Sequence, residues 1–454
     1  MFIKEQREFF ASGKTLKISF RIEQLKKILF LLQTNEKKIA DALKKDLNKS
    51  VMESVATEIL VVIDELKFII KNLKKWMRPV KVSSVFPLCF PGKSFILHEP
   101  YGSVLIIGPW NYPFMLILSP LIGAISAGNC VVLKPSEIAS HAETLLLQLI
   151  RDNFPPEYIS VATAGPEEMP ALLNEKFDYI FFTGGTHIGK IVMQAAAKNL
   201  TPVTLELGGK SPCIIDDTVD LDYAARKIIF GKFMNVGQVC LSPDYLYVKQ
   251  SCKNSLIEKL KKTLTDFYGK DPETSESYCR IINAKHFHRL IALMQNTNII
   301  TGGNYNESTL YIAPTLIDNI SWNDPIMQEE IFGPLLPILT YENQDDLIAT
   351  LKSKPKPLAL YVFTKNKSFE QRILEQVSFG GGCINDCIMQ VANFHLPFGG
   401  VGTSGIGAYH GKYSFETFSH RKSIFKRPWL IDISLAYPPY SSQKLLWLKR
   451  LMRW

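Results

Sequence analysis

The chain has 454 residues, more than one hydrophobic core usually supports, so two or three domains are expected. Hydrophobic residues make up 46% of it and charged residues 21%, a composition that excludes global disorder and is ordinary for an α/β protein. The formal net charge is +9 at pH 7, but eight Lys or Arg residues and one Asp lie within residues 421–454. The body is therefore almost neutral, which argues against a nucleic-acid partner and points to an anionic surface for the C-terminal segment.

The first 76 residues are expected to form amphipathic helices. Apolar residues recur at intervals of three and four in two stretches, from Ile22 to Leu32 and from Ile59 to Ile70. The N-terminus lacks an uninterrupted apolar run, so a signal peptide is not indicated. The helical pattern breaks at Arg78-Pro79, and residues 80–97 are expected to form an extended or hairpin arm that leaves the body.

From Gly102 onward, short apolar runs alternate with turns and helical stretches. The runs at 104–107, 131–134 and 179–182 predict strands of βαβ units, and hence a mostly parallel sheet with its ligand site at the carboxyl ends of the strands. The most apolar region, 104–133, contains several Pro and Gly residues, so we expect buried strand and loop there and no membrane-spanning helix.

The third of these runs leads into a glycine-rich turn. Gly184 to Gly189 follows it, and a helix is expected over 190–199, an arrangement that leaves backbone N–H groups and a helix dipole facing a phosphate. The dinucleotide pattern G-x-G-x-x-G is incomplete because Thr186 occupies its second glycine. A tight turn without a ligand is about as well supported by this local pattern.

Eight cysteines are scattered without C-x-x-C spacing, which favours a reducing, cytoplasmic compartment and neither a disulfide framework nor a metal site. Cys130, Cys213 and Cys383 lie in strand-like apolar runs that packing explains. Cys240 differs because it follows Gly-Gln-Val and precedes Leu-Ser-Pro, a loop-like context in which a thiol can face a ligand. With Glu206 about 34 positions earlier, it supplies a nucleophile and a base.

Seven ordered motifs resemble the aldehyde dehydrogenase superfamily, over a region from about residue 5 to residue 440. The short N-terminus and the run 404–415 are similar to the class 3 branch, which includes fatty aldehyde dehydrogenases. The motifs are GPWNYPF at 108–114, LKPSE at 133–137, FTG at 182–184, LELGGK at 205–210, GQVC at 237–240, QEEIFGP at 328–334 and PFGGVG at 397–402. This resemblance implies an α/β aldehyde dehydrogenase-like fold with a Rossmann-type cofactor domain, an α/β catalytic domain and a small bridging arm.

By this resemblance Cys240 is the nucleophile, Glu206 the general base and Asn111 the amide that stabilises the oxyanion. Attack by the thiolate, loss of hydride to a nicotinamide and hydrolysis of the thioester would oxidise an aldehyde to its acid. The implied cofactor is NAD, with NADP accepted as well, and Glu137 favours NAD because a carboxylate repels a 2′-phosphate. The implied cofactor-binding residues are Trp110, Lys134, Glu137, Gly184, Gly189, Glu330 and Phe332; a solvated Lys134–Glu137 pair and a structural Glu330 are the alternatives.

Tyr112 and Phe398 are candidates for the substrate site, together with Ile388, Met389 and Phe394, although core packing explains each equally well. His410, in the class 3 run, is expected to be structural. The expected reaction is oxidation of medium- or long-chain aliphatic aldehydes, or of aromatic or isoprenoid-derived ones. The alternatives are a CoA-acylating dehydrogenase, against which Glu206 argues, and a non-catalytic binding protein on the same fold.

The expected domains are a cofactor-binding domain at 1–79 and 98–207 and a catalytic domain at 208–405. Residues 80–97 and 406–440 would be bridging or oligomerisation segments, because the resemblance implies a homodimer. The tail at 441–454 is basic and amphipathic: apolar residues from Leu445 to Trp454 share one helical arc, with Lys449 and Arg450 on another. It is too short to span a bilayer, and peripheral membrane contact and docking on a partner subunit are both left open.

Overall fold

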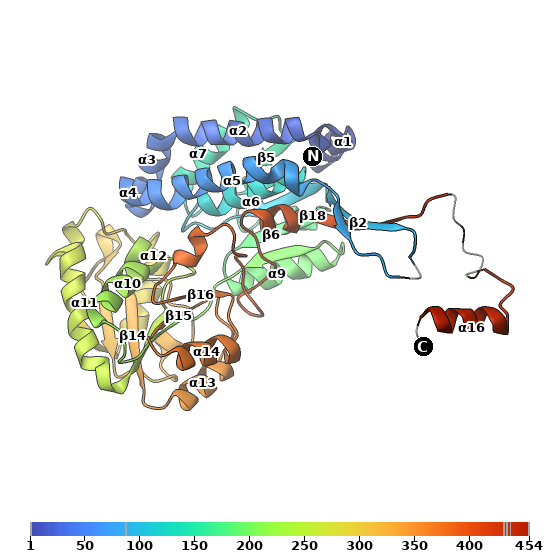
Figure 1. Cartoon of the computed structure of the whole chain (residues 1–454). Coiled ribbons are helices and arrows are strands. Elements are labelled where there is room, and N and C mark those ends of the chain that lie inside the picture. Colours follow the sequence, from blue (N-terminus) through green and yellow to red (C-terminus); the bar gives the residue numbers. More distant parts are fainter. Residues whose placement is uncertain (1, 87–88, 430–431, 433–434, 436, 453–454) are drawn as a thin grey trace.

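Three β-sheets organise the chain in a computed structural model that describes residues 2–86, 89–429, 432, 435 and 437–452. Two are largely parallel and lie in the two halves of the body, and the third is an antiparallel arm that projects from it (Figure 1). The predicted α/β class is therefore confirmed. Among the described residues, no helix has both the length and the apolar character required to cross a membrane.

The first sheet has six strands in the order β17-β7-β6-β3-β4-β5. Every pair is parallel except the edge pair of β17 with β7. The strand order runs outward in opposite directions from β3 and β6, so a crevice is expected between the carboxyl ends of these two strands. The bounds are β3 Ser103–Ile107, β4 Cys130–Lys134, β5 Ile159–Val161, β6 Tyr179–Thr183, β7 Val203–Glu206 and β17 Gly405–Ile406.

The helices of this half include the predicted N-terminal helices, whose apolar stripes are buried. Figure 1 shows α2 and α5 lying along one side of the sheet, with α9 on the other. The bounds are α1 Phe2–Ala11, α2 Ile18–Thr34, α3 Glu36–Leu47, α4 Val51–Ser54, the π-helix η2 Val55–Leu60, α5 Val61–Trp76, α6 Met115–Ala127, α7 Ser140–Arg151, α8 Met169–Asn174 and α9 Thr186–Ala197.

Two sequence-based expectations in this half were wrong in detail. Residues 115–127, expected to be strand and loop, form α6, all of whose residues are buried. A helix that is apolar all round is stable only inside a core, where tertiary packing overrides the breaking tendency of Pro120. The helix expected to begin at Lys190 begins at Thr186, so Gly189 lies inside α9 and not in the preceding loop.

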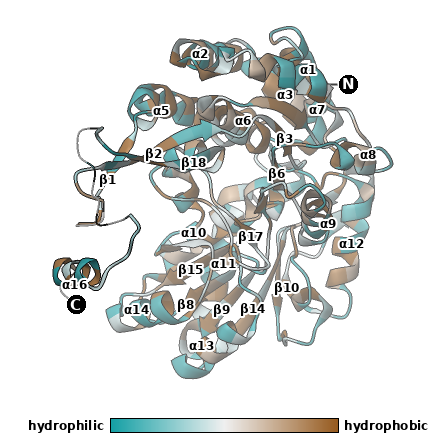
Figure 2. Ribbon diagram, turned by 90° about the vertical axis from the view of Figure 1, so that its right-hand side faces the viewer, coloured by the Kyte–Doolittle hydropathy of each residue, from teal (hydrophilic) through white to brown (hydrophobic). Residues whose placement is uncertain are grey.

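The second sheet has seven strands in the order β10-β13-β14-β9-β8-β15-β16, all parallel except β10. Its strands are β8 Pro212–Ile215, β9 Tyr245–Lys249, β10 Asn298–Thr301, β13 Thr315–Asp318, β14 Leu335–Tyr341, β15 Ala359–Phe363 and β16 Gly381–Ile384, with a separate hairpin of β11 Tyr305–Asn306 and β12 Tyr311–Ile312. Its helices are α10 Leu221–Phe233, α11 Lys253–Tyr268, α12 Ala284–Met294, α13 Gln344–Ser353 and α14 Lys367–Gln376. Figure 2 shows hydrophobic segments toward the inside of the molecule and hydrophilic ones on the outer helices.

The arm is an antiparallel sheet of β1 Val80–Val82, β2 Lys93–Pro100 and β18 Ser419–Lys426, which confirms the predicted hairpin. β18 adds the later segment to it after α15 Lys412–Thr417. The tail forms α16 Ser442–Leu451, set apart from the body in Figure 1; Arg453 and Trp454 of the predicted tail helix lie outside the described residues, as do parts of both bridging segments.

Short 3₁₀ turns complete the described chain. They are η1 Lys14–Leu16, η3 Met234–Gly237, η4 Gln250–Cys252, η5 Pro272–Thr274, η6 Glu307–Thr309, η7 Pro325–Met327 and η8 Met389–Ala392. The domain boundaries remain a prediction. Their position is consistent with the division between the two large sheets, although β17 straddles the expected boundary at 405.

Candidate active site

A cavity of about 460 Å³ lies where the two halves of the body meet, at the crevice between β3 and β6. The loop after β3 contributes to one side of it, and the turn after β6 and the end of β7 contribute to another. The second half supplies the loop before β9 and the loop before β14. The fold thus brings together seven of the predicted residues, which are Trp110, Asn111, Gly184, Glu206, Cys240, Glu330 and Phe332.

Cys240 follows a sharply turned stretch of backbone. Asn235 and Val236 both have φ of 47°, and Gly237 has φ of 77°. Val236 is strained there, since β-branched residues avoid positive φ, and such strain clusters at functional sites. A Cβ on Gly237 would lie 2.3 Å from the carbonyl oxygen of Gly333, so only glycine fits against the loop that follows Glu330.

Asn111 and the Cys240 loop are joined by direct hydrogen bonds. The side-chain amide of Asn111 donates to the carbonyl of Gln238 at 2.9 Å, and Asn235 Nδ2 donates to the carbonyl of Asn111 at 3.0 Å. Asn111 and Asn235 are buried. One amide N–H of Asn111 is used in this way, and its second has no acceptor among the described residues. That second N–H is the donor that an oxyanion would need.

Glu206 ends β7 with its side chain almost fully buried. Within the described part of the chain, neither carboxylate oxygen has a hydrogen-bond partner. Burial therefore raises the pKa of Glu206 well above its usual range. A buried, unpartnered carboxyl that faces a cavity is free to exchange a proton with a bound molecule.

The thiol of Cys240 is held in its neutral form. Burial raises its pKa, and the nearby carboxyls of Glu330 and Glu206 raise it further. The backbone N–H groups of Cys240 and Leu241 act in the opposite direction, since they favour a thiolate. A thiolate at Cys240 consequently forms only when the thiol proton is removed within the site.

Glu330 lies on the opposite wall, against the crossover from β7 to β8. A Cβ on Gly208 would lie 2.0 Å from a Glu330 carboxylate oxygen, so the carboxylate in this position lies directly against the Gly208 backbone. Burial raises the pKa of Glu330 to about 8, Asp244 adds to this, and the Gly209 N–H opposes it. Phe332, with φ of 50°, meets the Trp110 ring edge-to-face at 5.3 Å.

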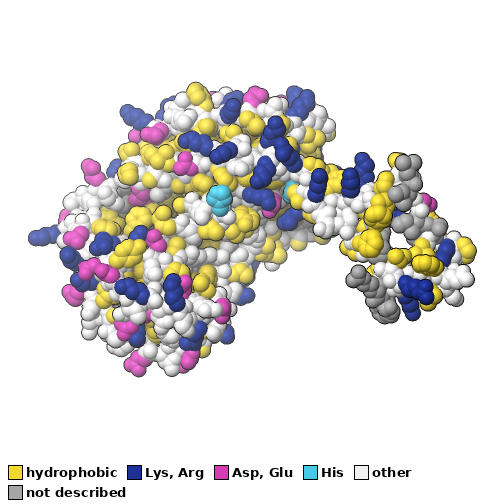
Figure 3. Space-filling model, in the orientation of Figure 1, with side chains coloured by type: hydrophobic (Ala, Val, Ile, Leu, Met, Phe, Trp, Pro, Cys, Tyr) yellow, Lys and Arg dark blue, Asp and Glu magenta, His cyan; other side chains and the backbone are white. Residues whose placement is uncertain are grey.

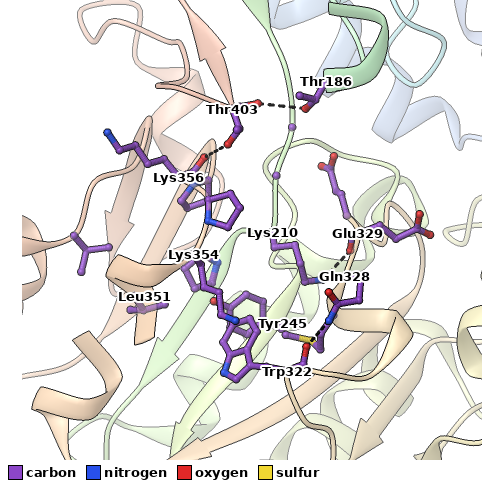
Figure 4. Close-up of a pocket in the computed structure, with 18 of the residues that line it drawn as sticks. Thr186, Lys210, Tyr245, Trp322, Gln328, Glu329, Leu351, Lys354, Lys356 and Thr403 are labelled. Atoms are coloured by element: carbon purple, nitrogen blue, oxygen red, sulfur yellow. Dashed lines mark hydrogen bonds between the residues drawn. The ribbon is translucent and has the colours of Figure 1, made fainter. Parts of the chain in front are cut away.

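Lys210 is hydrogen-bonded to the loop that carries Glu329 and Glu330 (Figure 4). Its ammonium donates to the carbonyls of Ile326 and Glu329, both at 2.9 Å, and pairs with Asp244. Asp244 in turn accepts the Ile331 N–H at 2.8 Å. Since Asp244 also follows Cys240 closely in sequence, this network connects the two loops of the second half.

A second cavity, of about 660 Å³, extends the first over the carboxyl ends of β3, β4 and β6. Lys134 and Glu137 line it and form an ion pair at 2.8 Å. The start of α9 also faces it, and its free N–H groups and dipole suit a pyrophosphate. Among the described residues, no side chain comes within 4 Å of a Cβ built on Gly185, so the turn is open there. The two adjoining cavities therefore fit an extended dinucleotide.

Gly189 has a different environment from the one expected. It is buried in α9, and a Cβ there would lie 2.7 Å from Leu207. Its missing side chain lets the helix pack closely on the sheet, and Gly189 is not among the described residues that line either cavity. Its predicted contact with the cofactor stays a prediction.

The two substrate candidates are both buried. The Tyr112 hydroxyl has no partner in the described structure, and its ring lies 4.1 Å from the Lys49 ammonium. Phe398 stacks on His410 at 5.0 Å and meets Tyr409 edge-to-face. Tyr112 and Tyr409 are both close enough to Cys240 for its charge to raise their pKa values, but neither Tyr112 nor Phe398 is among the described residues that line the cavity.

Three site residues were missed from the sequence. The His286 ring packs against Trp110 in a tilted arrangement with the ring centroids 4.9 Å apart, and burial lowers the pKa of His286 to about 4, so a neutral imidazole lines the cavity. Arg289 lines the cavity and donates to the carbonyl of Ile331 at 2.6 Å. Tyr409 was passed over beside His410. No local signal marks the first two, because they lie on the inner face of α12, which packs there only in the folded chain.

Comparison with known proteins agrees with this geometry. The model of the aldehyde dehydrogenase family matches residues 2–424. The chain belongs to the aldehyde dehydrogenase family. It therefore oxidises aldehydes to carboxylic acids with NAD or NADP as hydride acceptor, as the motifs predicted.

Individual relatives place the chain in the predicted branch of this family. The 4,4'-diaponeurosporen-aldehyde dehydrogenase of Staphylococcus aureus is 48% identical over 97% of this chain and 96% of its own. Aldehyde dehydrogenase family 3 member A2 of Mus musculus is 44% identical, over 98% of this chain and 92% of its own. A solved structure, the substrate-bound state of Staphylococcus aureus AldH, superposes with a TM-score of 0.97 at 47% identity, covering 99% of this chain and 98% of that one.

Proposed function

We propose that Cys240 is the nucleophile of this aldehyde dehydrogenase, Glu206 its general base and Asn111 its oxyanion donor. The observation that carries the proposal is that these three side chains line one cavity, which therefore holds a thiol, a carboxylate without a hydrogen-bond partner among the described residues and an unused amide N–H. Deprotonated Cys240 attacks the aldehyde carbonyl, and the oxygen that becomes negative accepts hydrogen bonds from Asn111 and the Cys240 backbone.

The remaining steps regenerate the thiol. A bound nicotinamide would accept the hydride that leaves the tetrahedral carbon. The acyl group then remains on Cys240 as a thioester. Glu206 takes a proton from water, the hydroxide adds to the thioester, and the carboxylic acid leaves as the C–S bond breaks. The proton returns to the sulfur, which completes one two-electron oxidation.

Seven residues are proposed to bind the cofactor. Lys134 and Glu137 would hold the adenosine ribose, Gly184 and the start of α9 the pyrophosphate, and Glu330 with Phe332 and Trp110 the nicotinamide half. Gly189 would act by letting α9 approach. The negative carboxyl of Glu137 favours NAD over NADP because it repels a 2′-phosphate.

The proposed substrates are medium- or long-chain aliphatic aldehydes, with isoprenoid-derived ones included. Tyr112 and Tyr409 lie near Cys240 and Phe398 packs edge-to-face on Tyr409, and aromatic side chains of this kind suit an apolar chain. A relative of 48% identity is named for diaponeurosporen-aldehyde, which agrees with a large apolar substrate. Initial rates over aldehydes of increasing chain length, with each cofactor, test this assignment; a preference for the shortest aldehydes contradicts it.

Glu206 also distinguishes hydrolysis from transfer to CoA. A base that activates water would destroy a thioester meant for a thiol acceptor. Acid should therefore form without CoA, and a strict CoA requirement would contradict the proposal. The role of Cys240 is tested by Cys240→Ser, which should abolish NADH formation while NAD still binds; retained NADH formation would instead favour a different nucleophile or a non-catalytic role for this site.

The arm and the tail are proposed to mediate association. β18 is an edge strand that pairs only with β2 among the described residues, and such an edge is suited to extend a sheet in a homodimer. On α16, Leu445, Trp447 and Leu448 are exposed beside Lys449 and Arg450 (Figure 3). Apolar and basic side chains together suit reversible binding to an anionic membrane. A cytoplasmic enzyme bound in this way would lie close to lipid aldehydes.

A further inference from the structure

The segment 49–58 contacts both the loop that carries Asn111 and the loop that carries Cys240. It contains Lys49, α4 and most of the π-helix η2. Hydrogen bonds in a π-helix join residues five apart, so Glu53 and Glu58 lie about one turn from each other. Single π-turns are rare and often occur at functional sites. Neither glutamate is part of the catalytic motifs.

Glu58 holds the loop that carries Asn111. It forms a fully buried ion pair with Lys49 at 2.6 Å, and its second oxygen accepts the Phe114 N–H at 3.0 Å. The Lys49 ammonium also lies 3.4 Å from the Asn111 carbonyl. Two buried charges compensate each other here and fix the backbone on both sides of Tyr112.

Glu53 holds the loop that carries Cys240. Its carboxylate accepts the backbone N–H of Asn235 at 2.8 Å, and its other oxygen is 3.5 Å from Cys279 Sγ. Asn235 is the first of the three residues with positive φ that turn the chain toward Cys240. An N–H at such a turn has no partner from regular secondary structure, so an acceptor supplied by the side chain stabilises the turn.

We propose that Glu53 is a positioning residue for Cys240. Its side-chain oxygen fixes the Asn235 N–H, which sets the turn at 235–237 and so aims the thiol at the aldehyde beside the Asn111 amide. The same short segment thus holds the nucleophile through Glu53 and the oxyanion donor through Glu58. The inference rests on the proposed role of Cys240. What the turn requires is a hydrogen-bond acceptor at this point, and the negative charge is secondary.

The variants Glu53→Ala and Glu53→Gln test this directly, because Gln keeps an oxygen that can accept the Asn235 N–H and Ala does not. Glu36→Ala and Glu36→Gln are matched controls, since Glu36 is an exposed glutamate that begins α3. Three quantities are measured. They are kcat divided by the number of sites that iodoacetamide can alkylate, the rate at which iodoacetamide alkylates Cys240, and KM for NAD. A merely structural role would lower the folded fraction without changing rates per site.

We expect Glu53→Ala to lose about tenfold or more in kcat per site and in alkylation rate, since small misplacements of a reacting group have effects of this size. KM for NAD should stay unchanged, and Glu53→Gln should retain both rates to within about threefold. Unchanged rates in Glu53→Ala would overturn the proposal, and so would an equal loss in Glu53→Gln. If the Ala variant does not fold, Glu53→Asp replaces it, because the shorter carboxylate retreats from Asn235 and the same loss is expected.

A failure of the proposed function can be distinguished from a failure of this inference. Retained NADH formation in Cys240→Ser would contradict the nucleophile itself, whatever the behaviour of the Glu53 variants. If Cys240→Ser is inactive and Glu53→Ala keeps wild-type rates per site, only the positioning role of Glu53 is contradicted.

Discussion

The side-chain amide of Asn111 lies 2.9 Å from the carbonyl oxygen of Gln238, two residues before Cys240. This bond spans the interface between the two large sheets, since Asn111 follows β3 and Gln238 precedes β9. The proposed oxyanion donor and the proposed nucleophile are therefore fixed relative to each other before any ligand binds. Such preorganisation lets a donor stabilise charge without reorganising during the reaction.

Replacing Asn111 by Ala removes the proposed oxyanion donor. The rate constant for the first NADH formed should fall about 100- to 1000-fold, the usual effect of losing one such donor. Affinity for NAD should hardly change, since the nicotinamide contacts are proposed for other residues. Stopped-flow NADH absorbance measures the rate. Asn72→Ala is the control, because Asn72 also donates to a main-chain carbonyl, that of Phe68 in α5; an equal loss there would show a general effect of folding.

Replacing Glu206 by Gln should uncouple acylation from hydrolysis. The pKa of Glu206 is raised by burial, and a base acts only when ionised, so hydrolysis in the wild type should speed up as pH rises through that pKa. In Glu206→Gln this pH dependence should disappear and steady-state kcat should fall about 100-fold or more. One equivalent of NADH per site should still appear as a burst. Multiple turnovers with a wild-type pH profile would contradict the assigned role.

From residue types and local context alone, the sequence predicted the pair of Cys240 and Glu206 and the glycine-rich turn at Gly184, and its strand pattern placed a ligand site at the carboxyl ends of the strands. It indicated Asn111 only through its resemblance to the aldehyde dehydrogenase superfamily. It could not predict Glu53, whose partner is 182 positions away and meets it only in the folded chain. The same limit applies to α6, where burial on all sides made a helix out of a segment with strand-like composition.

A buried carboxyl outside the proposed chemistry should control stability. Glu65 in α5 is fully buried, and one of its oxygens accepts the Gly411 N–H at 2.8 Å. Burial raises its pKa to about 7 from 4.5, opposed by that N–H and by the hydroxyls of Ser119 and Ser414. The pKa of Glu65 is therefore higher in the folded state than in the unfolded state. Its contribution to the free energy of unfolding is fully present below about pH 4.5 and is lost as the pH rises through 7.

The variant Glu65→Gln does not titrate, so it should escape this loss. Its free energy of unfolding relative to that of the wild type should increase by about 3 kcal/mol between pH 4 and pH 8, because a pKa shift from 4.5 to about 7 corresponds to about that free energy. Thermal unfolding midpoints of both proteins across this range provide the measurement. A difference between variant and wild type that stays constant with pH would contradict the prediction.

Removing residues 442–454 tests the role of the tail. If α16 binds an anionic membrane, the truncated enzyme should no longer sediment with vesicles that contain phosphatidylserine, while activity on short aldehydes remains. Binding by the full chain should weaken in high salt, because Lys444, Lys449 and Arg450 would act partly through charge. Vesicles of phosphatidylcholine alone are the control. Unchanged sedimentation would contradict membrane binding, and a change in subunit number would favour docking on the partner subunit.

Replacing Glu137 by Gln should change the choice of cofactor. The Glu137 carboxylate is partly exposed in the larger cavity, and its ion pair with Lys134 at 2.8 Å helps to hold its pKa below the usual range despite its burial. It is therefore negative at neutral pH, where it repels a 2′-phosphate.

Without the charge of Glu137, Lys134 is free to attract the phosphate. The ratio of kcat/KM for NADP to that for NAD should rise about tenfold, equivalent to about 1.4 kcal/mol. Glu143→Gln, on the neighbouring helix α7, should leave the ratio unchanged, because Glu143 is not among the described residues that line the cavity. If the ratio changes equally in both variants, a general effect of lost negative charge explains it, and Glu137 does not bind the ribose.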